Sequence, residues 1–455
     1  MMRKKLTVCI VLITVLMLLA GCKGNAPTTT APEAPAQVQQ DAVVEGTKEE
    51  TTLIVWDVMN RPEESAILDV VIANFEAAHP GVKIARESKN LDDLKVTSAL
   101  ALGSQDGPDV VQVNQGESDM GAMVKAGLLL PLDVYAAKYG WLDTFAEGLA
   151  ALNSWSDDGA HMGEGNLYGL PLQAEIVGVY YRKDIFKQYG LSIPKTYAEF
   201  EAVMAKLAEA GEVPLVYGNL DGWPAIHLYS EIQNAELAER GWYDDFMFLR
   251  NNVSFDIPAN KAAAEKLTGW VENGYLTPGF EGIGYDDSWQ LFLAGEGTMM
   301  LTGSWMSGEF VASEIADEIG FFLVPPVEAD GYKLSVGGTG LAFAIRKSSP
   351  NADLAAEYLN YLYSEETAIA LAEAGLLPVY PIDTSVIGGG LLGDIASAWV
   401  SATLDDGIGY YMDWVTPTMY DTISASLQEL MAGKISADEF VAKINGDYSG
   451  FLSSK

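Results

Sequence analysis

The sequence predicts an α/β protein with more than one lobe. The chain has 455 residues and is 49% hydrophobic, whereas a single hydrophobic core stops growing near ~250–300 residues. Short apolar runs typical of buried strands alternate with segments of helical periodicity, which favours a mostly parallel sheet covered by helices. No repeat of fixed period occurs, which argues against a solenoid.

The individual elements follow from local patterns. The first strand is expected at residues 52–56, and the helix after it begins at Pro62 and ends before His79-Pro80-Gly81. Further strands are expected at 82–84, 109–113, 177–181, 298–301, 320–324 and 340–345. Further helices are expected at 92–102, 197–210, 261–273, 353–362, 365–374, 422–432 and 437–443.

The N-terminus has the pattern of an export signal. A basic start, Arg3-Lys4-Lys5, precedes an apolar run over residues 6–20 that is too short for a ~20-residue membrane span. Leu19-Ala20-Gly21-Cys22 resembles the bacterial lipobox. We therefore expect a lipoprotein signal peptide over residues 1–21 and acylation of Cys22, with an uncleaved membrane anchor as the alternative. The composition of residues 22–51 predicts a lipid-anchored flexible tether.

Charge and composition argue against several functions. The formal net charge is −36, which argues against binding to nucleic acid and against docking on anionic lipid through a basic patch. Two Cys and three His leave little for a disulfide framework or a zinc site. Metalloprotease, hydrolase-elbow and Walker A patterns do not occur in the sequence, so we expect no cofactor and no metal.

Eight short segments occur in a specific order along the chain. They are residues 107–110, 167–171, 178–184, 194–200, 292–300, 303–305, 349–352 and 375–379. In this order they resemble the extracellular solute-binding proteins of family 1, the carbohydrate-binding components of ABC importers. Arg182 replaces an asparagine that is common in the family, which is a departure in detail.

The resemblance implies a two-lobed periplasmic-binding-protein fold of type II, with discontinuous lobes joined by a hinge. Lobe 1 would contain residues 52–174 and 336–375, and lobe 2 residues 175–335 and 376–455. The chain would cross between the lobes near 173–175, 335–338 and 374–377. A ligand would lie in the cleft between the lobes.

Sugar chemistry indicates which residues to expect in that cleft. A pyranose has apolar faces and a rim of hydroxyls, so its site needs flat aromatic surfaces and planar polar groups. The candidate binding residues are Asn60, Arg61, Asn114, Gln115, Glu175, Asp221, Trp223, Asp286, Trp289, Trp305, Gly338 and Trp414.

Most polar candidates follow predicted strands or lie on predicted crossovers. Residues 60–61 and 114–115 lie in strand-end loops, where functional groups gather, although capping or turn roles are the alternative. Glu175 and Gly338 lie on crossovers. The alternatives there are a solvated strand-edge charge for Glu175 and hinge flexibility for Gly338.

The aromatic candidates compete with a packing role. The resemblance places stacking rings at Trp305 and near Trp414, and core packing is the alternative for both. Asp221 and Trp223 lie in a segment expected to form a polar turn. Asp286 precedes a helix and could instead serve as its N-cap.

These observations predict a binding protein rather than an enzyme. We expect a monomeric substrate-binding protein, lipid-anchored on the extracytoplasmic face of the cell membrane. It would capture a sugar, expected to be an oligosaccharide, by hinge closure and deliver it to the permease subunits of an ABC importer. The alternatives are a surface enzyme that cleaves polysaccharide, a binding protein for a non-sugar polar solute, and a receptor that presents ligand to a signalling partner.

Overall fold

The computed structural model describes residues 50–455 apart from 146, 238 and 384–386. The expected signal peptide and Cys22 lie outside the described residues, as does most of the expected tether. The first strand starts at Thr51, one residue earlier than predicted. Among the described residues, no helix has both the length and the apolar character that a membrane crossing requires.

The first sheet has five strands in the order β2-β1-β3-β11-β6. The strands are β1 (Thr51–Asp57), β2 (Val82–Ser88), β3 (Val110–Val113), β6 (Leu170–Pro171) and β11 (Ala342–Ile345). Strand β1 runs parallel to β2 and β3, whereas β11 runs antiparallel to β3 and β6. The parallel arrangement expected from the sequence therefore holds for the three N-terminal strands.

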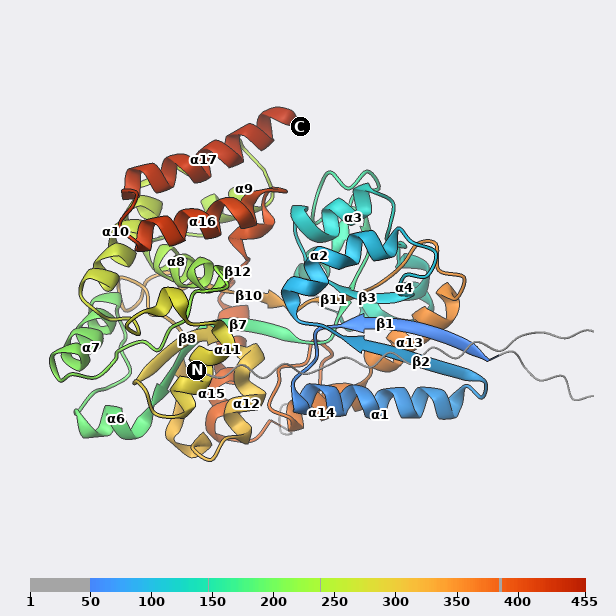
Figure 1. Ribbon diagram of the computed structural model, residues 1–455, viewed down its shortest axis with the longest axis horizontal. Helices are drawn as coiled ribbons and strands as arrows, with labels where there is room; N and C mark the ends of the chain where they lie inside the picture. Colours follow the sequence, from blue (N-terminus) through green and yellow to red (C-terminus); the bar gives the residue numbers. More distant parts are fainter. Residues whose placement is uncertain (1–49, 146, 238, 384–386) are drawn as a thin grey trace, which may run out of the picture. The chain divides into compact units, whose positions relative to one another are not determined.

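Helices cover both faces of the first sheet. The first lobe, as we call this sheet with its helices, contains α1 (Pro62–Ala78), α2 (Leu91–Leu102), α3 (Ala122–Lys125), α4 (Asp133–Tyr139), α5 (Glu147–Ala151), α13 (Ala352–Leu362), α14 (Glu365–Glu373) and the small ribbon β4 (Ser154–Trp155) with β5 (Asn166–Leu167). Helix α1 lies along one face and α2 along the other (Figure 1). Accordingly, Phe343 and Ile345 of β11 belong to one core while Ala342 and Ala344 belong to the other, because strand side chains alternate between faces.

The second sheet is mostly antiparallel, which corrects the sequence prediction. Its strands are β7 (Ala174–Arg182), β8 (Met299–Gly303), β9 (Ile319–Phe322), β10 (Ser335–Thr339) and β12 (Ile408–Gly409). Strand β7 pairs antiparallel with β8, β9 and β10, and only β10 with β12 is parallel. The strands come from distant segments joined by long connections, so the strand–helix alternation along the chain does not fix their direction.

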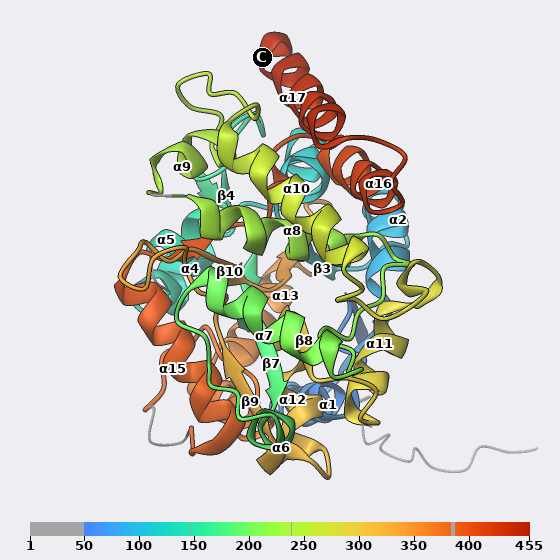
Figure 2. The ribbon, with the colours of Figure 1, turned by 90° about the vertical axis from the view of Figure 1, so that its left-hand side faces the viewer.

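Helices of the second lobe, defined as the second sheet with its helices, form two further cores. They are α6 (Lys183–Gln188), α7 (Tyr197–Glu209), α8 (Trp223–Glu236), α9 (Gly241–Met247), α10 (Pro258–Glu272), α11 (Tyr285–Leu293), α12 (Ser307–Ala312), α15 (Gly390–Leu404), α16 (Met419–Met431) and α17 (Ala437–Ser454). Helices α8, α10, α16 and α17 pack together over the sheet (Figure 2). The turn expected around Trp223 is instead the start of α8, which has Pro224 in its first turn.

Three segments link the two lobes. The chain passes from β6 to β7 near Gln173 and returns from β10 to β11 through residues 340–341. The third segment runs beside the first, because the Ala174 N–H donates to the Leu377 carbonyl oxygen at 2.8 Å. Residues 335–338, expected to be a crossover, lie in strand β10. The exact lobe boundaries given above stay predictions.

Candidate functional site

A cavity of ≈ 970 Å³ is lined by residues of both lobes. This volume lies at the upper end of the range of ~300–1,000 Å³ typical of small-molecule sites. The first lobe contributes the loops after β1, β2 and β3, whose carboxyl ends meet at one sheet edge because the three strands are parallel. The second lobe contributes the first turns of α8 and α11, Trp305 and residues 411–420. Glu309 of α12 and the links between the lobes also line the cavity.

Eleven of the twelve predicted binding residues line this cavity. They are Asn60, Arg61, Asn114, Gln115, Glu175, Asp221, Trp223, Asp286, Trp289, Trp305 and Trp414. Gly338 is outside the wall. A Cβ there would lie 2.9 Å from Leu152 Cδ1 and the residue has φ +132°, so the glycine serves close packing. Its neighbours Thr339 and Gly340 line the cavity instead.

Two of these eleven residues offer little surface to a ligand. Gln115 is 1% exposed and Trp414 is 2% exposed. The Gln115 Nε2 group donates to Thr339 Oγ1 at 3.1 Å and to the Gly340 carbonyl oxygen at 2.9 Å, which fixes one of the interlobe links. Trp414 packs against Gly116, where a Cβ would come within 2.6 Å of the Trp414 Cα atom. Both residues therefore shape the wall from behind.

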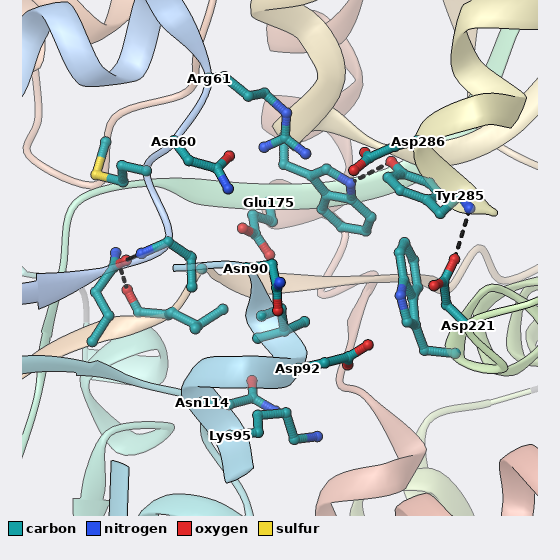
Figure 3. Close-up of a pocket in the computed structure, with 18 of the residues that line it drawn as sticks. Asn60, Arg61, Asn90, Asp92, Lys95, Asn114, Glu175, Asp221, Tyr285 and Asp286 are labelled. Carbon is teal, nitrogen blue, oxygen red and sulfur yellow. Dashed lines mark hydrogen bonds between the residues drawn. The ribbon is translucent and has the colours of Figure 1, made fainter. Parts of the chain in front are cut away.

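Trp305 stands on the cavity wall in a fixed orientation. It lies just after β8 and is partly exposed. Its Nε1 group donates to the Tyr285 hydroxyl at 2.7 Å, and Asp221 Oδ2 accepts from the Tyr285 backbone N–H at 2.7 Å (Figure 3). Trp223 packs beside both rings, with its ring centroid 4.4 Å from that of Tyr285. These contacts hold two indoles and an acidic side chain along one wall, which suits a ring with an apolar face.

Glu175 lies centrally among the labelled side chains (Figure 3). The Tyr411 hydroxyl donates to its Oε2 atom at 3.1 Å. A Cβ at position 340 would lie 2.5 Å from Glu175 Oε1, so only glycine there leaves room for the carboxyl group. The pKa of Glu175 is raised to about 7, chiefly by burial. The nearby charge of Glu64 contributes to the increase, whereas the hydrogen bond from Tyr411 opposes it.

The start of α2 supplies a group of cavity residues that the sequence analysis missed. Asn90 caps this helix, accepting a hydrogen bond from the backbone N–H of the third residue after it at 2.7 Å, and Asp92 lies in the first turn. Lys95 Nζ lies 3.6 Å from Asp119 Oδ2 and 3.7 Å from the centroid of the Tyr420 ring. These residues follow β2, which ends at Ser88 and not at residue 84 as predicted, so the rule that functional groups gather at strand ends did not point to them.

The cavity wall is acidic. Two cations, Arg61 and Lys95, line it together with the carboxyl groups of nine residues: Glu64, Asp92, Asp93, Glu175, Asp221, Asp286, Asp287, Glu309 and Asp413. Burial raises the pKa of Asp413 to about 6 and lowers that of His227 to about 3, which leaves the imidazole neutral. In the described part of the chain, no group of three or more His, Cys, Asp or Glu side chains is arranged to hold a metal ion. Carboxylates accept hydrogen bonds, so the wall favours a ligand rich in donors.

The family model for bacterial extracellular solute-binding proteins matches residues 60–369. The multiple sugar-binding protein of Streptococcus mutans is 24% identical over 313 residues, which cover 66% of this chain and 69% of that protein. The alpha-glucosides-binding periplasmic protein AglE of Rhizobium meliloti is 26% identical over 348 residues, or 72% of each chain.

A solved structure of a chitin oligosaccharide binding protein is similar to this chain throughout the described body. It superposes with a TM-score of 0.75 at 23% identity and covers 88% of this chain and 99% of that one. The likeness shows the fold, which is the two-lobed α/β fold predicted from the sequence.

Proposed function

The chain belongs to the bacterial extracellular solute-binding proteins, and we propose that it captures an oligosaccharide in the cavity between its lobes for an ABC importer. The related proteins named above are binding proteins, so at the family level this chain is a binding protein rather than an enzyme. Their printed ligands are sugars, which supports a carbohydrate ligand here.

The observation that carries the proposal is the convergence of Trp305, Glu175 and Asn114 on one cavity from three separate elements. An indole offers a flat face for the C–H side of a sugar ring. A carboxyl group and an amide offer acceptors and donors for its hydroxyls. The cavity volume of ≈ 970 Å³ supports an oligosaccharide.

The proposed mechanism is closure of the two lobes around the ligand. The cavity wall is divided between the lobes, and the links near Gln173 and at residues 340–341 are short. A ligand that touches both walls binds the closed arrangement more tightly than the open one and shifts the population toward it. The permease would then recognise the closed form.

A panel of oligosaccharides tests the binding function. We expect at least one glycan to raise the melting temperature and to change the tryptophan fluorescence, because three partly exposed indoles (Trp223, Trp289 and Trp305) line the cavity. Amino acids and peptides at the same concentrations serve as controls. A panel in which only the non-sugar solutes bind would support the alternative of a different polar ligand.

Export and lipid anchoring are the second part of the proposal. The lipobox-like Leu19-Ala20-Gly21-Cys22 supports acylation of Cys22 and display on the outer face of the membrane. We expect Cys22→Ser to release the protein from the membrane fraction and to abolish incorporation of radiolabelled palmitate. Retention of the variant in washed membranes would favour an uncleaved anchor.

Delivery to a permease is tested separately in cells. We expect deletion of the gene to abolish uptake of the glycan that the purified protein binds, and the wild-type gene to restore it. Normal uptake combined with loss of a transcriptional response to the glycan would instead favour the receptor that serves a signalling partner.

A further inference from the structure

Each cation of the cavity wall lies within 4 Å of a carboxylate. Arg61 Nη1 lies 3.7 Å from Glu64 Oε2, and its side chain is 24% exposed. Lys95 Nζ lies 3.6 Å from Asp119 Oδ2 and also lies over the Tyr420 ring. Among the described residues that line the cavity, no other Lys or Arg is present. An anionic group that entered would therefore compete with carboxylates for each cation.

The exposed carboxylates face the cavity from both lobes. Asp92 belongs to α2 of the first lobe, whereas Asp221 and Asp286 belong to the second lobe, and all three side chains are exposed. Figure 3 shows them around the same space. Burial makes the largest contribution to the raised pKa of Asp92, and the negative charge of Asp221 raises this pKa further. The contribution of Asp221 reflects repulsion between carboxylates of the two lobes.

One buried acceptor on the wall lacks a donor. The Oε1 atom of Gln115 has no hydrogen-bond partner, and this residue, which is 1% exposed, lines the cavity. Because an unsatisfied buried acceptor is costly, this atom favours a ligand that donates hydrogen bonds. The Oε2 atom of Glu64 is instead the atom that faces Arg61 at 3.7 Å, so Glu64 counts with the charged groups of the wall.

Building on the proposed function, we propose that the cavity selects uncharged glycans and rejects glycans that carry carboxylate, sulfate or phosphate groups. A neutral glycan brings hydroxyl donors to the acceptor-rich wall. A uronic acid brings a negative charge among nine carboxyl groups and replaces a donor with an acceptor. The negative charge of the ligand is repelled by carboxylates on exposed side chains, so added salt screens this repulsion.

Matched pairs of glycans test this selectivity on the full-length protein. The pairs are xylo-oligosaccharides with and without a glucuronic acid branch, and oligogalacturonides of equal length with and without methyl esters on their carboxyl groups. By calorimetric titration we expect the acidic member of a pair to bind at least ~10-fold more weakly at about 20 mM NaCl, a difference of about 1.4 kcal/mol. We expect this ratio to shrink at about 500 mM NaCl.

Charge-neutralising variants locate the effect. In the double variant Asp92→Asn, Asp221→Asn the acidic-to-neutral ratio of Kd values is expected to fall several-fold. Asn at position 221 keeps an oxygen that can accept from the Tyr285 N–H. The matched control is Asp106→Asn, Asp330→Asn, which removes two exposed charges that do not line the cavity and is expected to leave the ratio unchanged.

The outcomes separate this inference from the proposed function. An acidic glycan that binds as tightly as its neutral partner, or more tightly, overturns the selectivity and leaves the carbohydrate-binding function standing. Equal effects of the two double variants would likewise contradict the role of the cavity carboxylates. Failure of every glycan in the panel, neutral and acidic, removes the proposed function and this inference with it.

Discussion

At the residue scale, the site depends on a few side chains held by second partners. Trp305 is held by its hydrogen bond to Tyr285, and Glu175 by its hydrogen bond from Tyr411. Such support fixes the orientation of a binding group before the ligand arrives, which reduces the entropy cost of binding. Each of these side chains therefore leads to a separate prediction.

We expect Trp305→Ala to weaken glycan binding by about 2 kcal/mol, or ~30-fold, because it removes a flat apolar surface from the cavity wall. Trp305→Phe keeps an aromatic face and loses the hydrogen bond to Tyr285, so its affinity is expected to lie between wild type and the alanine variant. Isothermal titration with the best glycan of the panel measures both. Wild-type affinity in the alanine variant would show that Trp305 serves packing alone.

Glu175 makes stability depend on pH. Its pKa in the folded protein is raised to about 7 from the usual 4.5. The folded state therefore binds more protons than the unfolded state, and the free energy of unfolding falls as pH rises from about 4.5 to about 7. Glu175→Gln removes this penalty. The free energy of unfolding of the variant minus that of wild type is therefore expected to increase by on the order of 2 kcal/mol as the pH rises from about 5 to about 8.

Urea unfolding of both proteins at the two pH values measures this gain. Asp413 and the other carboxyl groups with raised pKa are present in both proteins, so they cancel in the difference. A difference between variant and wild type that does not change with pH would contradict a raised pKa at Glu175.

At the element scale, helix α2 combines a structural and a binding role at its N-terminus. Asn90 caps α2 beside the cavity, whereas Thr196 caps α7, and Thr196 does not line the cavity. We expect Asn90→Ala and Thr196→Ala each to lower the free energy of unfolding by about 1 kcal/mol, the usual cost of losing an N-cap. Urea melts measure this loss.

Only Asn90→Ala is also expected to weaken glycan binding, by several-fold, because it changes the position of Asp92 and removes an amide from the wall. Titration of the two variants with one glycan compares them. If both variants weaken binding equally, the effect reflects general destabilisation and not the position of α2.

At the scale of the whole molecule, the cavity joins two lobes that have separate cores. A ligand that binds only the folded protein stabilises it by RT ln(1 + [L]/Kd), about 2.7 kcal/mol at a hundredfold excess over Kd. Because the ligand touches both walls, we expect hydrogen exchange to slow in both sheets on binding. Protection confined to one lobe would contradict closure around the ligand.

Much of this architecture was predictable from the sequence because local patterns determine it. The helix that begins at Pro62 and the strand that contains Gly320 follow from local patterns, namely an apolar run for the strand and helical periodicity with start and stop residues for the helix. The binding candidates after β1 and β3 follow from the rule that functional groups gather at strand ends. The length of the chain indicated more than one lobe, and the family resemblance supplied the expected crossovers, of which residues 335–338 lie in β10 instead.

The sequence by itself determined part of the strands and helices, such as β1 and α1, and the polar residues that follow β1 and β3. Only the tertiary structure decided that the second sheet is antiparallel, that Gly340 rather than Gly338 faces the cavity, and that Trp414 lies behind the wall. These features depend on contacts such as Gly340 with Glu175 and Trp414 with Gly116. Contacts between residues far apart in sequence leave no periodic signal, because each is set by how whole elements pack against one another.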